Sequence, residues 1–168
     1  TILDKMIDVQ RHRDPIGKIY SISAEGLAVG MVNHHDKIFS DQSVSHLFNT
    51  PSIDSSVAAF VDGIVLNTLA LRDALIEFDY SSTRPTCSAV IAAAYKRWGL
   101  DFMSHLEGEF ACVVWDGRLN RIILARDPYG HKPLHYYAKN SALYFSSEIK
   151  GLLAAGLPRE VDLVNLSD

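Results

Sequence analysis

The spacing of hydrophobic residues along the chain alternates between helical and strand-like periods. Apolar positions recur at helical spacing in 1–10, 66–77 and 85–98, which predicts amphipathic helices. Short apolar or alternating runs predict strands at 18–23, 27–32, 57–61, 110–115, 121–125, 134–137 and 143–146. A last helix is expected at 148–155, before a glycine and a proline. Strands and helices in separate blocks predict an α+β protein.

Turn signals suggest how these elements connect. The Glu-Gly pair at 25–26 predicts a hairpin, and the Asp-Gly pair at 62–63 predicts a tight turn between a buried strand and a helix. Turns at 116–117 and 139–140 are expected to join the last four strands into one antiparallel meander. The polar stretch 34–56 predicts a long surface loop.

One strand has no polar side. The run at 110–115 reads FACVVW, so both of its faces are expected to be buried between layers. Helices that cover two antiparallel sheets satisfy this pattern, because each sheet then has an apolar face on either side.

Composition narrows the class of protein. A chain of 168 residues with a net charge of -4 predicts one domain, 1–168, without the basic footprint of a nucleic-acid partner. Cys87 and Cys112 lie in apolar segments, which indicates buried thiols in a reducing compartment. The apolar run at 57–61 is too short for a membrane span, and no signal peptide opens the chain. A cytoplasmic location without membrane contact is therefore predicted.

Two isolated features suggest other chemistry. His34-His35-Asp36 resembles part of a metal cluster, but adjacent histidines on a strand point to opposite faces, so solvated loop residues are the simpler interpretation and no metal site is predicted. Thr1 is a candidate N-terminal nucleophile, although the helical pattern that follows it does not supply a rigid strand.

The dense turn chemistry at 126–134, RDPYGHKPL, predicts a rigid connection between two strands, and a site there is the alternative. Together with its flanks it carries a resemblance. The run LEGEFACVVWDGRLNRIILARDPYGHKPLHYY…ALYFSSEIKGLLAAGLPREVD, at 106–162, resembles the second half of the glutaminase domain of asparagine synthetase and other class II glutamine amidotransferases. FA-x-x-x-WD, L-x-RD-x-x-G-x-KPL-x-Y and SEIK-x-LL stand in that family's order.

Weaker matches extend the resemblance over nearly the whole chain. His12-Arg13-x-Pro15 is similar to the family's HRGPD. The stretch at 62–67, DGIVLN, is similar to its NGE-x-x-N, and TCSA at 86–89 to its SDTE. The fold that the resemblance implies is a four-layer αββα sandwich of the N-terminal nucleophile hydrolase type.

The resemblance also implies a nucleophile that this sequence does not contain. Members of the family begin with a cysteine whose own amine helps to activate the thiol, and no such start precedes Thr1 here, so no catalytic residue is assigned. We expect the chain to be a fragment, with the family's N-terminal strand and the following synthetase domain absent. A sheet without that strand is expected to pair with another segment or chain, or to be poorly stable alone.

The remaining positions of the resemblance describe a vestigial glutamine pocket. Asp62 stands where the family has an oxyanion-binding Asn amide, and a carboxylate carries no donor there. Cys87 replaces the aspartate that holds the glutamine ammonium, and Val32 or Asn33 replaces the arginine for its carboxylate. The expected pocket residues are Asn33, Asp62, Gly63, Ile64, Cys87 and Ala89.

These substitutions predict a degenerate glutaminase-like domain with a structural or regulatory role in an asparagine-synthetase-like, amide-forming ligase. The alternative is a trimmed but working glutaminase that releases ammonia from glutamine. No cofactor is expected in this domain, since no phosphate-binding Gly-rich loop occurs; ATP and Mg are expected only in a downstream synthetase domain. That domain or another chain is the expected partner, with glutamine and an oligomer as further candidates.

Overall fold

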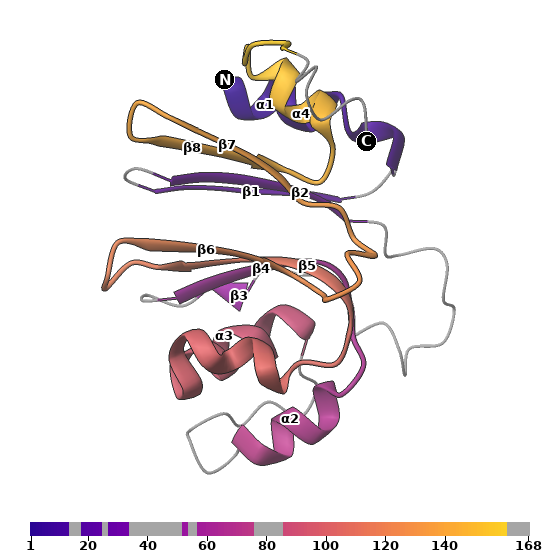
Figure 1. Cartoon of the computed structure of the whole chain (residues 1–168), viewed down its shortest axis with the longest axis vertical. Helices are drawn as coiled ribbons and strands as arrows, with labels where there is room; N and C mark the ends of the chain where they lie inside the picture. Colours follow the sequence, from indigo (N-terminus) through magenta and orange to yellow (C-terminus); the bar gives the residue numbers. More distant parts are fainter. Residues whose placement is uncertain (14–17, 25–26, 34–51, 54–56, 76–85, 161–168) are drawn as a thin grey trace.

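The computed structural model describes residues 1–13, 18–24, 27–33, 52–53, 57–75 and 86–160, and within it the elements stack in four layers (Figure 1). Helices α1 and α4 form one outer layer, and α2 and α3 form the other. The two layers between them are β-structure, which confirms the predicted αββα sandwich. The helices are α1 (Ile2–Asp8), α2 (Thr68–Leu75), α3 (Cys87–Trp98) and α4 (Ile149–Ala154), with 3-10 turns η1 (Arg11–Arg13) and η4 (Gly99–His105).

The strands divide into one larger and two smaller sheets. They are β1 (Lys18–Ala24), β2 (Leu27–Asn33), β3 (Ser52–Ile53), β4 (Val57–Val65), β5 (Gly108–Asp116), β6 (Arg121–Arg126), β7 (His135–Lys139) and β8 (Ala142–Ser146). Strands β3-β4-β5-β6 form one antiparallel sheet, whereas β1-β2 and β7-β8 are separate two-stranded ribbons. Both ribbons lie in the layer beneath α1 and α4 (Figure 1).

The predicted meander is therefore wrong at one connection. Strands β6 and β7 follow each other in sequence but belong to different layers. The segment between them crosses from one layer to the other, and Asp127 organises it by accepting hydrogen bonds from the backbone N–H groups of Phe110, Tyr129 and His131. A strand-to-strand turn signal cannot distinguish a hairpin from such a crossing.

The predicted turn at Asp62-Gly63 is also wrong, because β4 continues through both residues to Val65. Asp62 pairs with Ala111 and Gly63 with Phe110 on β5. Gly63 has φ +114°, and a Cβ there would collide with the backbone oxygen of Glu109. The glycine is needed where two backbones approach closely, rather than where the chain reverses.

Helix α3 packs on the opposite side of this sheet from the ribbons and begins as the sequence predicts. The Thr86 hydroxyl accepts a hydrogen bond from the N–H of Ala89, and Gly99 ends the helix with φ +60°. Its buried face forms the larger hydrophobic core with β4 and β5, centred on residues such as Phe102 and Phe110 that are at most 1% exposed.

The other predicted elements agree with the structure within a few residues, except at the end of the loop predicted for 34–56. There the two-residue strand β3 pairs with β4. The rest of that loop, the turn at 25–26 and the His34-His35-Asp36 group lie outside the described residues. Among the described helices, none combines the length and the hydrophobicity that a bilayer crossing requires.

Candidate functional site

A cavity of about 1040 Å³ lies between the two β layers. Its walls come from β2, from β8 and from the inner face of β4-β5-β6, and α1 closes the side toward the outer helices. Most of the lining is apolar, with Phe60, Val113 and Trp115 as examples. Among the described residues, the charged ones that line it are Arg13, Asp62, Glu109 and Lys132.

Asp62 reaches this cavity because side chains alternate along β4. Ala58 and Phe60 belong to the small apolar cluster between the sheets, and Asp62 follows on the same face. Its carboxylate is bound from two sides: Arg13 Nη2 lies 2.8 Å from Oδ2, and Ser147 Oγ donates to the same oxygen at 2.8 Å. Asp62 is therefore an acceptor whose charge is already paired.

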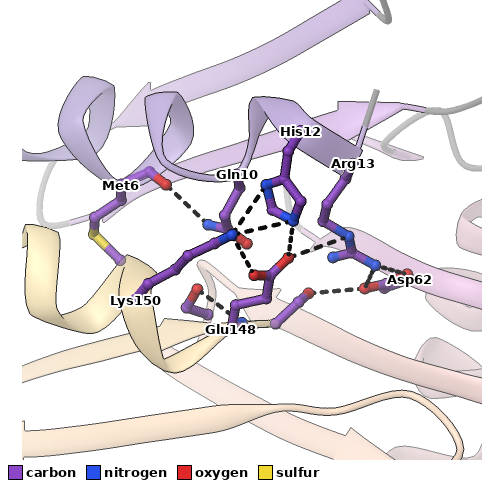
Figure 2. Close-up of polar contacts among 9 residues, drawn as sticks. Met6, Gln10, His12, Arg13, Asp62, Glu148 and Lys150 are labelled. Carbon is purple, nitrogen blue, oxygen red and sulfur yellow. Dashed lines mark hydrogen bonds and ion pairs between the residues drawn. The ribbon is translucent and has the colours of Figure 1, made fainter. Parts of the chain in front are cut away.

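The ion pair continues into a wider polar network (Figure 2). Glu148 Oε1 lies 3.2 Å from His12 Nε2 and 3.8 Å from Arg13 Nε, while its Oε2 lies 3.0 Å from Lys150 Nζ. Arg13 thus stands between two carboxylates. The network ties η1 to β4 and to the junction of β8 with α4, three segments distant in sequence.

Gly63 and Ile64 also line the cavity, and the structure gives Gly63 a packing role. A side chain at Gly63 would meet the Cα of Phe110 and the Cγ of Lys132, each at 2.9 Å, in addition to the Glu109 oxygen. Nearby, the Asn67 amide donates to the carbonyl of His105 at 2.8 Å and accepts from the N–H of Glu107 at 3.1 Å. These residues fix how the end of β4 meets the start of β5.

Cys87 and Ala89 are not among the residues that line this cavity. Cys87 is fully buried at the first turn of α3, in the core on the other side of β4. Its sulfur accepts a hydrogen bond from the N–H of Val65 at 3.4 Å, and burial raises the pKa of the thiol. Asn33 pairs with Lys18 through the backbone, and its side chain lies outside what the structure describes.

Sequence reasoning missed the partners of Asp62. In the sequence, Arg13 stands out only within the His12-Arg13-x-Pro15 motif, and Ser147 and Glu148 stand out only within SEIK. A usable signal was present, since a carboxylate on an otherwise apolar strand needs a cation or several donors. Both motifs supply such groups.

Thr1, the candidate N-terminal nucleophile, has a structural role. The Thr1 amine and hydroxyl both bind the Asp4 carboxylate, at 2.6 and 2.7 Å, so Thr1 caps α1 at an exposed position. Within the described residues, no group of three or more His, Cys, Asp or Glu side chains is arranged to hold a metal ion.

The connection at 126–134 is built around a buried carboxylate. Asp127 is 2% exposed; burial raises its pKa, but the His131 ring and the surrounding N–H groups outweigh that effect and lower the pKa to about 2. The His131 Nδ1 lies 3.1 Å from Asp127 Oδ1. These contacts agree with the predicted rigid connection.

Comparisons with known proteins converge on one family. The family model described as "Glutamine amidotransferase domain" matches residues 40–154. Amidase chyE of Penicillium rubens is 36% identical over 167 residues, which cover 99% of this chain and 24% of that protein. Asparagine synthetase [glutamine-hydrolyzing] 2 of Bacillus subtilis is 30% identical over 154 residues, which cover 91% of this chain and 20% of that protein.

A solved structure supports the fold alone. The glutamine phosphoribosylpyrophosphate amidotransferase of B. subtilis, complexed with ADP and GMP, superposes with a TM-score of 0.52 at 22% identity. The match covers 77% of this chain and 29% of that one. The chain spans about a quarter or less of the length of the curated relatives just described.

Proposed function

Because the chain belongs to the glutamine amidotransferase domain family and is related to the asparagine synthetases, we propose that it is the glutaminase-like domain of an ATP-dependent, amide-forming enzyme and that it no longer hydrolyses glutamine. In this proposal the domain keeps a structural or regulatory role. The relatives' printed names, a glutamine-hydrolysing asparagine synthetase and an amidase, support the amide chemistry of the parent protein.

The observation that carries the proposal is that Asp62 is a carboxylate bound by Arg13 and Ser147. Hydrolysis of the glutamine side-chain amide develops an oxyanion, which needs preorganised donors. The Asp62 carboxylate donates nothing, and both of its oxygens lie within 3.2 Å of Arg13 Nη2. Losing one oxyanion donor costs about 3 to 4 kcal/mol of transition-state stabilisation, a factor of about 10² to 10³ in rate.

The burial of the Cys87 thiol supports the same conclusion. In the family, an aspartate at this position binds the ammonium group of glutamine. Burial raises the pKa of the Cys87 thiol, so the thiol stays neutral at neutral pH and cannot pair with a cation. Its sulfur is also engaged with the N–H of Val65, on the α3 side of the sheet. A glutamine zwitterion therefore has no counter-charge at this position.

The role that remains is support for a neighbouring domain. We expect the partner to be the synthetase domain of the same protein, which would bind ATP and Mg and activate a carboxylate for attack by an amine. The Asn67 bridge, the Gly63 close approach and the Asp127-centred connection belong to the architecture, and a scaffold requires them whether or not glutamine is cleaved.

One observation favours the alternative of a working glutaminase. Arg13 offsets the charge of Asp62, so an oxyanion near Asp62 would face a neutral pair rather than an isolated negative charge. The cavity also remains large enough for a small ligand. In that case a cysteine at the mature N-terminus of the full-length protein would supply the nucleophile.

Ammonia and glutamate release from L-glutamine distinguish the two candidates. The full-length protein is assayed with ATP and Mg, beside a glutamine-hydrolysing asparagine synthetase as positive control. The proposal expects no release above background from the wild type or from Asp62→Asn, because restoring one donor does not restore the ammonium contact. Equimolar ammonia and glutamate that disappear when an N-terminal cysteine is changed to alanine would support the working glutaminase instead.

A further inference from the structure

The side chains of His131 and Glu109 come close together without bonding. Nε2 of His131 lies 4.0 Å from Oε1 of Glu109, which is too long for a hydrogen bond. Both side chains are about half exposed, at 46% and 57%. The other nitrogen of the His131 ring indicates what kind of group fits between these two atoms.

The Asp127 carboxylate determines which ring nitrogen of His131 carries the proton. Nδ1 lies 3.1 Å from Oδ1 of Asp127. A carboxylate only accepts hydrogen bonds, so Nδ1 is the donor and Nε2 of the neutral ring keeps a lone pair. Nε2 and the Glu109 carboxylate are therefore two neighbouring acceptors, and a cation between them would interact with both.

Asp127 also holds together the two segments that carry these acceptors. Its N–H donates to the carbonyl of Phe110 at 2.8 Å, and its Oδ2 accepts from the N–H of Phe110 at 3.2 Å. Phe110 directly follows Glu109 on β5. The His131 ring makes an edge contact with the Tyr129 ring, with the centroids 5.6 Å apart. The arrangement is thus fixed by contacts within the protein.

The three side chains have the order of a metal site with its supporting carboxylate. Imidazole nitrogen and carboxylate oxygen are zinc ligands, and a metal-binding histidine commonly donates its other N–H to a carboxylate, as His131 does to Asp127. Ligand atoms about 2.0 to 2.2 Å from a tetrahedral ion stand about 3.3 to 3.6 Å apart, so Glu109 would move by about 0.5 Å. The Arg126 guanidinium lies beside Gly130 and opposes a second cation, so a modest affinity is expected.

We propose that His131 and Glu109 bind a divalent transition-metal ion such as zinc, with the Asp127 carboxylate hydrogen-bonded to the far side of the imidazole ring. No group of three or more His, Cys, Asp or Glu side chains among the described residues could hold a metal, so water or a donor from another molecule would complete the coordination. The ion would tie the connection at 126–134 to the start of β5. This binding does not depend on whether glutamine is hydrolysed.

Modification of His131 by diethyl pyrocarbonate reports whether Nε2 is available. The full-length protein is treated at neutral pH with increasing zinc chloride, and peptide mass spectrometry gives the modified fraction of His131. We expect modification without metal and protection that saturates as zinc is added. Magnesium chloride should not protect His131, because magnesium prefers oxygen ligands.

Glu109→Gln and Glu107→Gln form a matched pair, because both glutamates are exposed and lie two residues apart. Glu109→Gln should need at least about tenfold more zinc for the same protection, since even a change behind a metal ligand costs about 10- to 100-fold in affinity. Glu107→Gln should behave like the wild type. Zinc should also slow amide hydrogen exchange at 126–131 in the wild type and leave it unchanged in His131→Gln.

Any of four results would overturn the proposal. One is that zinc does not protect His131. Another is that Glu109→Gln and Glu107→Gln need the same zinc concentration, which would indicate adventitious binding to the imidazole alone. The third is equal protection by magnesium, which would indicate a general effect of divalent cations. The last is that His131 resists modification without metal, because Nε2 would then not be available to an ion.

Discussion

The two faces of β4 hold different kinds of structure. On the face toward α3, Val57, Ala59 and Val61 enter a continuous core that contains sixteen buried residues among those described. On the face toward the ribbons, Ala58 and Phe60 belong to a described cluster of only four, beside the cavity and Asp62. One face of this strand thus borders the dense core, and the other borders the cavity and the ion pair of Asp62 with Arg13.

The largest expected difference between the faces is in truncation of a phenylalanine. Phe110→Ala empties a site in the dense core and should lower the free energy of unfolding by about 3 to 5 kcal/mol. Phe60→Ala should lower it by only about 1.5 to 3 kcal/mol, because a cavity already adjoins it and mainly the transfer term is lost. Urea unfolding of both variants checks this, and equal losses would show that the two faces are packed alike.

Acid stability is expected to depend on carboxylates outside the cavity. The pKa of Asp127 is lowered to about 2, and hydrogen bonds from Arg118 lower the pKa of Asp116 despite its burial. A depressed folded pKa contributes stability above the unfolded value of about 3.9, and that contribution is lost as pH falls toward about 2.

Thermal unfolding between pH 7 and pH 2 tests this dependence. The wild type should lose stability mainly below about pH 4, and Asp127→Asn should show a shallower decline over the same range. Asp101→Asn is the control, because this carboxylate lies at an exposed position of η4. An unchanged pH profile for Asp127→Asn would contradict the assignment.

A smaller effect is expected for the ion pair in the cavity. Arg13 and Asp62 have side chains that are 25% and 27% exposed, so solvent weakens their attraction. A double-mutant cycle with Arg13→Met and Asp62→Asn should give a coupling energy of about 1 kcal/mol, measured by urea unfolding. A coupling energy near zero would mean that the pair is not formed in solution.

The smallest change is expected in the alkylation of Cys87 and Cys112, which both lie in the core on the α3 side of the sheet. Burial raises the pKa of Cys112 to about 12 and also raises that of Cys87. Iodoacetamide at pH 8 should leave both thiols unmodified in the folded chain and alkylate both in urea. Mass spectrometry of the folded sample reports the result directly, and rapid alkylation of Cys87 would place it nearer to solvent than described.

Local periodicity and turn chemistry were sufficient to predict most helices and strands. The helix ended by Gly99 and the buried strand FACVVW follow from residues within a few positions of each other. The layers followed because a strand that is apolar on both faces needs cover on both sides.

The errors arose where distant residues decide the structure. Asp62-Gly63 reads as a turn in isolation, but pairing with Ala111 and Phe110 of β5 extends the strand through it. The partnership of Asp62 with Arg13 joins residues 49 positions apart, and the one with Ser147 joins residues 85 apart. Sequence spacing does not encode such contacts, although the need of a carboxylate on an apolar strand for a counter-charge pointed to them.

The central claim is that the architecture is retained while the glutamine contacts are lost. It is tested most directly by amide hydrogen exchange of the full-length protein with and without L-glutamine. Retained architecture predicts slow exchange along β4 and β5, and lost contacts predict that L-glutamine leaves this exchange unchanged. Exchange that slows saturably around Asp62, Gly63 and Ile64 as L-glutamine is added would contradict the claim and show that the cavity still binds glutamine.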